Sequence, residues 1–304
     1  MLVSSSTVKG DKPWNANSGF GCITWLGSAT SSRGGVTNGF FDYEIVAVYF
    51  WAVLHDRGVS WACEPINWSP DLRPWRIPSQ STMSRRMRSA EVQRLMGVME
   101  QRLRQQCGAP GWVNVVDGKP LVVGSHSKDP DARWGRAGRS YAKGYRLHAV
   151  YGSAPLPRQW EITAMNVSEP EVAARLIPAL NGGGYLLGDK IHDSNPLHEV
   201  ALATGYQLVA PRKRPGTGLG HRPHAPGRLR SMALLTKDFG KALYRCRMDI
   251  ERQFGWLTNH AAGLSPLPSW VRRLSRVQTW VHAKLIIHII YAYCYHPPPL
   301  LADA

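Results

Sequence analysis

Apolar residues follow two different patterns along the chain, and the pattern changes near residue 110. In the first part the apolar positions fit helices. The stretch "EIVAVYFWAVL" after Asp42 is almost wholly apolar, which is typical of a buried helix, and Gly58 can end it. The segment "SQSTMSRRMRSAEVQRLMGVMEQRLRQQ" contains two helical patterns that meet near Ser89. We therefore predict a small all-α region over residues 41–109.

After the Gly/Pro-containing "CGAPGW", short apolar runs indicate strands. Three strand patterns come first, and then a helix, a strand, a helix and a strand. In order they are "WVNVVDGKPLVVG", "YRLHAVYG", "QWEITAMNV", "EPEVAARLIPAL", "YLLGD", "PLHEVALATG" and "YQLVAP". This order predicts an α/β fold, a mixed sheet flanked by helices. Two longer helical patterns, "FGKALYRCRMDIERQFGWLTNH" and "PSWVRRLSRVQTWVHAKLIIHIIYAYCY", complete this second region, residues 110–304.

Two segments show neither pattern. Residues 1–40 are rich in Ser, Gly, Thr and Asn, so we expect a poorly ordered tail. The segment "RKRPGTGLGHRPHAPGRLR" follows the last predicted strand and is basic and rich in Gly and Pro. A loop of this length inside a domain is usually functional or disordered.

The net charge points to a polyanionic partner. The chain carries a formal charge of +16 and its pI is near 10.0. Such an excess of Lys and Arg indicates a nucleic acid, with a membrane surface as the competing interpretation. The most apolar stretch, "LIIHIIYAYCY", is shorter than the roughly 18 residues that a membrane span needs. We therefore expect a nucleic acid as the partner and no membrane.

Cysteine usage bears on the compartment. The five cysteines are scattered and never form a C-x-x-C pair, which argues against a disulfide framework and against a zinc ribbon. A reducing cytoplasm is the simplest setting for such a chain.

The helical region carries basic residues on one of its helices. Arg85, Arg86 and Arg88 all belong to the first of the two patterns that meet near Ser89. Short helices with a basic one among them are typical of a helix-turn-helix-like DNA-binding region. The alternative is a plain helical bundle whose arginines are solvated. We predict that Arg85 and Arg86 contact DNA.

Three acids are candidates for catalysis. Asp117 lies late in the first predicted strand, Asp189 ends the strand "YLLGD", and Glu251 lies in the first of the long helices. Strand ends can share one edge of a sheet, and a helix across that edge can add a glutamate. Converging carboxylates repel one another unless cations hold them. Oxygen ligands suit Mg²⁺ or Mn²⁺, and two such ions support phosphoryl transfer.

Each acid also has a structural alternative. Asp117 precedes Gly118 and could be a turn residue. Asp189 could cap a helix or form a salt bridge, and Glu251 could pair with Arg247 on the helix surface. The spacing of Tyr244, Arg247 and Glu251 by three and four residues nevertheless places them on one helix face, where they could hold a phosphate beside a metal.

Three further acids are predicted to have no catalytic role. Asp129 and Asp131 lie in the polar segment "SKDPDARWG", so we expect them to be solvated. Asp193 is expected to shape the turn before a helix.

With these motifs, the sequence resembles the DDE transposases of bacterial insertion sequences, of the insertion-sequence-four and -five type. The resemblance covers about residues 42 to 296. Asp117 in "VVDGKPL" matches the family's first aspartate. Asp189 in "LGDKIHDS" matches the second, in a D-K-x-Y-D-S turn in which His192 replaces the usual tyrosine. Tyr244, Arg247 and Glu251 match a Y-x2-R-x3-E-x6-K signature, with Thr258 at the position of the expected lysine.

The resemblance implies an RNase H-like fold and a specific reaction. Asp117, Asp189 and Glu251 would hold two Mg²⁺ ions, which Mn²⁺ can replace. The protein would cleave the terminal inverted repeats of its element and join the 3′-hydroxyl ends to target DNA. Tyr244 and Arg247, and more weakly Lys190, would position the phosphates of the ends. A homodimeric synaptic complex and a nucleoid-associated location in the bacterial cytoplasm are also implied.

Two rival interpretations remain open from the sequence. The first is a structure-selective nuclease of the same RNase H-like fold. The second is a domesticated DNA-binding protein with an inactive site. The basic helical region and the Tyr-Arg-Glu helix favour a transposase over the first rival. The intact set of three acids counts against the second.

Overall fold

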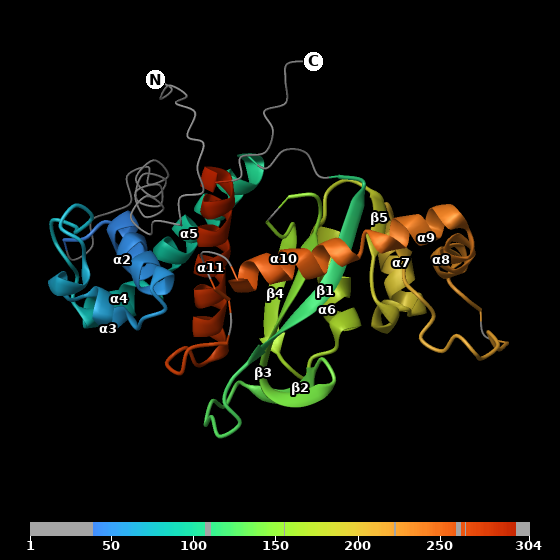
Figure 1. Cartoon of the computed structure of the whole chain (residues 1–304), viewed down its shortest axis with the longest axis horizontal. Helices are drawn as coiled ribbons and strands as arrows, with labels where there is room; N and C mark the ends of the chain where they lie inside the picture. The colour runs from blue at the N-terminus through green and yellow to red at the C-terminus, as the bar shows by residue number, and fades with distance from the viewer. Residues whose placement is uncertain are drawn as a thin grey trace, which may run out of the picture. The chain divides into compact units, whose positions relative to one another are not determined.

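The chain divides into two compact units between Leu95 and Met96. In the computed structural model, residues 39–106, 111–154, 156–221, 223–259, 263–264 and 266–295 are described (Figure 1). Nearly all of the expected tail, residues 1–38, lies outside them. The division falls inside α5 (Ala90–Gln106). The boundary that the pattern places after residue 109 remains a prediction.

The first unit is helical, as its periodicity predicts. It contains α2 (Asp42–Leu54), α3 (Val59–Ala62), η1 (Pro65–Asn67), α4 (Gln80–Arg86) and the start of α5. Every residue of α2 from Ile45 to Leu54 is buried, which agrees with its unbroken apolar run. Trp51 of this helix stacks on Trp68 with ring centroids 4.8 Å apart. The break between α4 and α5 falls near Ser89, where the two helical patterns meet.

The two arginines predicted to contact DNA have different surroundings. Arg85 is exposed on α4. Arg86 is buried and forms an ion pair with Asp42 at the start of α2. Since a buried charge requires a partner, this contact joins two helices of the unit. The placement favours a structural role for Arg86 over a role in DNA contact.

The second unit is built on a six-stranded mixed sheet, as the sequence predicts. Its strands are β1 (Val113–Val122), β2 (Arg133–Ala137), β3 (Ser140–Tyr151), β4 (Gln159–Ala164), β5 (Gly184–Leu187) and β6 (Tyr206–Val209). The order is β2-β3-β1-β5-β6, and β4 pairs with the second half of β3. β3 is antiparallel to its neighbours, whereas β1, β5 and β6 are parallel to one another. This curled mixed sheet with its flanking helices has the RNase H-like arrangement.

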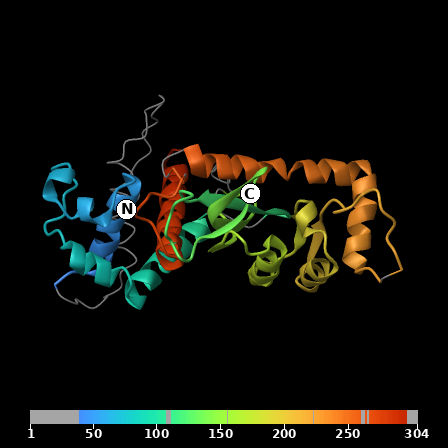
Figure 2. The ribbon, with the colours of Figure 1, turned by 90° about the horizontal axis from the view of Figure 1, so that it is seen from below.

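Helices cover both faces of the sheet (Figures 1 and 2). α6 (Glu169–Leu176) and α7 (Asn195–Ala203) lie on one face, and α9 (Asp238–Arg245) and α10 (Met248–Asn259) on the other. An apolar core fills the α6–α7 face and includes Val116 of β1 and Leu186 of β5. Because side chains alternate along a strand, Asp117 and Lys119 project from β1 toward α10.

Two elements of this unit were not predicted. β2 begins inside the polar segment "SKDPDARWG", where we expected no strand, and its residues pair with the first part of β3. α8 (Pro226–Thr236) takes the end of the basic segment, which we expected to be loop throughout. Both elements are short or polar, so their formation depends more on strand pairing and tertiary packing than on the local sequence pattern.

The last helix, α11 (Leu274–Tyr295), begins against acids that were expected to be solvated. Asp129 accepts hydrogen bonds from the Tyr145 hydroxyl (2.8 Å) and from the Arg273 amide (3.2 Å). Asp131 accepts one from the Leu274 amide at 3.0 Å. The expectation is wrong for Asp129, which is buried, because the first amides of a helix need acceptors. Among the described helices, 22-residue α11 included, none is both long and apolar enough to span a membrane.

Candidate active site

Two of the three candidate acids lie at the same level of two adjacent strands. β1 and β5 are parallel, and Val115 pairs with Leu187. Two residues further on, Asp117 and Asp189 therefore reach the same level of adjacent strands. Asp117 lies in the middle of β1, where it pairs with Ala149 of β3. The structure thus rules out the simple turn that the Asp-Gly sequence allowed.

The environment of Asp117 shows that the two acids interact. Burial raises the pKa of Asp117, while the Gly118 amide at 2.8 Å and the nearby Arg247 act in the opposite direction. The charge of Asp189 adds to the rise, and the net result is a pKa above the ordinary value. A cation placed between these carboxylates would relieve that cost.

Asp189 caps a short helical turn, one of the alternatives left open by its sequence. Its Oδ1 accepts hydrogen bonds from the Ile191 amide (2.9 Å) and from His192 Nδ1 (2.8 Å). Burial raises the pKa of Asp189, but these bonds and the charges of His192 and Arg247 outweigh it and lower the pKa. His192 is buried, so it holds the carboxylate from the protein side and leaves about a quarter of the Asp189 side chain exposed.

Arg247 connects the first and the third candidate acid. Its Nη2 lies 3.2 Å from Asp117 Oδ2, and its Nη1 lies 3.5 Å from Glu251 Oε1. Glu251 is 55% exposed, so it reaches the site through the arginine and not by direct contact. The structural alternative for Glu251, pairing with Arg247 on the helix surface, is therefore present.

The helix that carries these residues is interrupted, which differs from the continuous helix we expected. Residues 246–247 form a turn between α9 and α10, in which the amides of Cys246 and Arg247 bond three residues back, at 3.0 Å each. α9 and α10 still continue as a nearly straight rod (Figure 2). Tyr244, on the α9 side of the break, donates its hydroxyl to the Gly188 carbonyl at 3.2 Å. Tyr244 therefore reaches the end of β5, and Arg247 reaches Asp117 in the middle of β1.

The donors present are of the kind that Mg²⁺ prefers. Asp117 and Asp189 supply carboxylate oxygens at one level of the sheet, and Glu251 can add a third. In the described part of the chain, however, no three His, Cys, Asp or Glu side chains gather closely enough to hold a metal ion. The donor chemistry fits the cation, while Arg247 provides the positive charge in the arrangement seen here.

The comparison with protein families agrees with this arrangement. A family model described as "Transposase DDE domain" matches residues 108–290, more than half of the chain. The protein belongs to the transposase DDE domain family. The matched stretch contains the sheet, all three candidate acids and most of α11. Comparisons with curated proteins and with solved structures give no match.

A lysine in this transposase lies close to the position where the signature lysine is missing. Lys119 Nζ donates a hydrogen bond to Thr258 Oγ1 at 2.6 Å. Lys119 projects from β1 on the same face as Asp117, two residues away, and Thr258 lies near the end of α10. The partner of this cation is a neutral hydroxyl, and burial lowers the pKa of Lys119. The predicted phosphate contact Lys190, by comparison, is exposed on η3 (Lys190–His192).

Sequence reasoning missed an ion pair on the opposite face of β1. Glu169, at the start of α6, pairs with Arg146 of β3, and both are nearly buried. A Cβ on Gly118 would lie 2.8 Å from Arg146 Cδ and 3.0 Å from Glu169 Oε2, so glycine lets the pair approach the strand beside Asp117. Burial and the charges of Asp117 and Asp189 raise the pKa of Glu169. The glycine directly after Asp117 was the available signal, and it was interpreted as a turn.

Proposed function

We propose that this protein is the transposase of a bacterial insertion sequence of the four or five type. It binds the terminal inverted repeats of its element, cleaves at the ends and joins the 3′-hydroxyl ends to target DNA. The observation that supports this reaction best is the pair Asp117 and Asp189, at one level of adjacent parallel strands, with Arg247 reaching over them. The family match supports the general activity.

The three acids have one proposed task, the binding of divalent cations. Asp117, Asp189 and Glu251 would hold two Mg²⁺ ions, or Mn²⁺ in their place. When bound, these cations supply activation of the attacking oxygen and charge stabilisation of the leaving oxygen. Because Arg247 pairs with Asp117 and Glu251, the guanidinium is positioned to move from the acids to a phosphate of the substrate.

The neighbouring polar residues would orient the DNA. Tyr244 lies over the end of β5 and Arg247 over Asp117 of β1, where a scissile phosphate beside the acids would lie. Among the described residues Lys119 bonds to the neutral hydroxyl of Thr258, so we propose that it supplies the phosphate contact for which the lysine at position 258 is missing. Lys190 is exposed next to Asp189 and is a further candidate.

The remaining features of the proposal concern assembly and location. The helical region, including Arg85, would help to bind the transposon ends. Cutting of two ends in concert requires two active sites, so the working form would be a homodimer. The expected setting is the bacterial cytoplasm, where the protein would associate with the nucleoid.

Cleavage of the DNA that flanks the reading frame tests the proposal. The protein is incubated with that DNA on a plasmid, with Mg²⁺ or with EDTA, and cut ends are mapped to the nucleotide. We expect cuts at the outer edges of an inverted repeat that disappear in EDTA and in Asp189→Asn. Asp249→Asn is the matched control, because Asp249 is an exposed aspartate on α10 that pairs with Arg252.

Other outcomes would support the rivals. Salt-sensitive binding at the same ends without any cut would favour a domesticated, inactive relative. Cuts at branched DNA structures, whatever their sequence, would favour a structure-selective nuclease. Cleavage by Asp189→Asn at the parental rate would show that the acid assignment is wrong.

A further inference from the structure

The basic segment after β6 begins at the level of the acids. β5 and β6 are parallel, with Leu187 paired to Val209. Two residues beyond the Leu187–Val209 pair, the register places Pro211 beside Asp189. In the same way, the register of β1 and β5 places Asp189 beside Asp117. β5 and β6 thus end side by side at the level of Asp117, which lies within β1. Strands are about 4.8 Å apart, so the segment starts roughly 10 Å from β1. That distance corresponds to about three nucleotides along one DNA strand.

This segment, which we call the basic loop (residues 211–221), has excess positive charge. No acidic residue occurs between Glu199 and Asp238 in the sequence. Lys213 and Arg214 are exposed, and in the described part of the chain neither forms an ion pair with an acid. Arg212 instead bonds to carbonyls of the same loop, among them that of Thr217, and so stabilises its curvature.

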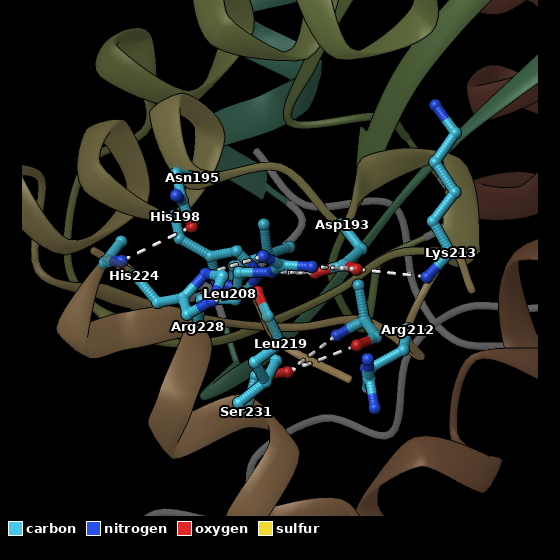
Figure 3. Close-up of polar contacts among 12 residues, drawn as sticks. Asp193, Asn195, His198, Leu208, Arg212, Lys213, Leu219, His224, Arg228 and Ser231 are labelled. Atoms are coloured by element: carbon cyan, nitrogen blue, oxygen red, sulfur yellow. Dashed lines mark hydrogen bonds and ion pairs between the residues drawn. The ribbon is translucent and has the colours of Figure 1, made fainter. Parts of the chain in front are cut away.

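The loop is fastened to the turn that Asp189 begins (Figure 3). Asp193, four residues after Asp189, accepts the Lys213 amide at 3.0 Å. Both Asp193 oxygens also bind Arg228 of α8, at 2.6 and 2.8 Å. The chain just after the basic loop is held by Asn195. This side chain donates a hydrogen bond to the Pro223 carbonyl (3.1 Å) and accepts one from the Ala225 amide (3.3 Å). Figure 3 shows the Lys213 side chain extending away from this cluster.

We propose that the basic loop is a clamp for the DNA backbone, held at a fixed place beside the active site by Asp193 and Asn195. Lys213 and Arg214 would each neutralise a phosphate a few nucleotides from the one at Asp117 and Asp189. The ligand is double-stranded DNA, because exposed cations in a row recognise backbone charge without reading bases. The inference rests on the proposed function, since it concerns the substrate of the same site.

The salt dependence of binding tests the clamp without any need for cleavage. The full-length protein is titrated in EDTA with a fluorescein-labelled duplex of about 30 base pairs, from about 0.05 to 0.2 M salt. Each phosphate contact contributes about 0.9 to the slope of log affinity against log salt. We expect the double variant Lys213→Gln/Arg214→Gln to bind more weakly, with a slope smaller by roughly two contacts. The variant Lys213→Arg/Arg214→Lys keeps both charges and is expected to keep the slope.

A third variant tests the fastening separately from the charge. Asn195→Ala removes both hydrogen bonds to the far end of the segment and leaves every cation in place. We expect about fivefold weaker binding at an unchanged slope, because a looser loop contacts the same phosphates at a greater ordering cost.

The outcomes of this experiment are separable from those of the cleavage test. An unchanged slope in Lys213→Gln/Arg214→Gln, or no binding of duplex DNA by the parent protein, would overturn the clamp. The protein could instead prefer single-stranded DNA of equal length, and Lys213→Gln/Arg214→Gln could lower the salt slope only with that single strand. This result would overturn the assignment of duplex DNA as the ligand. If the slope falls as expected but Asp189→Asn still cuts, the clamp stands and the active-site assignment fails.

Discussion

The turn after β5 begins and ends with an aspartate, and the two have opposite surroundings. Asp189 keeps about a quarter of its side chain exposed and is held through Oδ1 by one amide and one histidine. Asp193 is buried, and both of its oxygens bind Arg228 while an amide and His198 lie beside it. The Asp193 carboxylate is closed to a ligand because its side chain is only 1% exposed, whereas that of Asp189 is 25% exposed. The difference separates an acid that is available for chemistry from one that holds the fold together.

The cations of the site differ in the same way. Arg228 is fully engaged by the Asp193 carboxylate. Lys119 is held by a neutral hydroxyl, which orients its charge without neutralising it. Availability of a charged group can thus be judged from the charge of its partner, beyond its exposure alone.

The largest expected effect is on cleavage by Asp189→Asn. The substitution removes a proposed metal ligand but keeps an acceptor for the Ile191 amide. We expect the rate of end cleavage to fall at least about a thousandfold, as when one member of a catalytic unit is removed. Unfolding in urea is expected to be nearly that of the parent protein. A large loss of stability would place Asp189 with Asp193 among the structural acids.

Asp193→Asn is expected to give the reverse result. It leaves Arg228 without its charged partner inside the protein, which should lower the free energy of unfolding by about 3 kcal/mol. At saturating DNA, where weaker binding by the basic loop has no effect, the rate of cleavage per folded molecule should change little in comparison with Asp189→Asn. Urea unfolding and cleavage rates on the same preparations measure both quantities. Lost cleavage with unchanged stability would contradict the distinction between the two acids.

A smaller effect concerns His198, which lies against Asp193. Burial lowers the pKa of His198 to about 4, and among the described residues neither ring nitrogen has a partner within hydrogen-bond distance, Asp193 being 3.7 Å away. An unfolded histidine has a pKa of about 6.5, so it takes up protons first as the pH falls. Stability is then complete above about pH 6.5 and decreases toward pH 4, by about 2 kcal/mol at pH 5.

Comparison with a variant isolates the contribution of this histidine. His198→Gln cannot titrate, so its urea-unfolding free energy should depend less on pH between 7.5 and 5, a window that follows from the two pKa values. His148, whose pKa burial lowers to about 3, provides the matched control, because it remains in both proteins. Equal pH dependence in the parent and the variant would show that His198 is not buried in its neutral form.

The smallest expected effect belongs to Lys119. Lys119→Met keeps the length of the side chain and removes the charge, so the salt dependence of DNA binding should fall by about one phosphate contact. Thr258→Val removes the partner hydroxyl but no charge and should keep that slope. If Lys119→Met and the parent protein show the same salt slope, Lys119 does not contact the DNA backbone. Its bond to Thr258 then only stabilises α10 on the sheet.

Much of the fold follows from local pattern, and the departures have physical reasons. Short runs of apolar and aromatic residues correctly predict β1, β3, β4, β5 and β6, because each strand buries at least part of its length. Asp117 was placed late in its strand because Asp-Gly is also a turn signal. Pairing with β3 across eight residues outweighs that preference.

Contacts between residues far apart in sequence were not predictable. Nothing near Asp193 indicates that its partner is Arg228, thirty-five residues away, and nothing near Asp129 indicates that it caps α11. In the sequence, Arg86 resembles a DNA-contacting residue. In the structure, it forms a buried ion pair with Asp42. The sequence identifies charged residues of interest, but only the fold determines which of them have internal partners.

The bridge that Arg247 makes between Asp117 and Glu251 has a consequence for the idle protein. A divalent ion that arrives alone must compete with a guanidinium for the same oxygens. Once a phosphate draws the arginine away, that competition ends. We expect the apparent affinity for Mn²⁺ to increase when DNA is bound, as measured by metal titration with and without duplex, and equal affinities would refute it. Such a protein would bind its divalent ions tightly only when its DNA substrate is present.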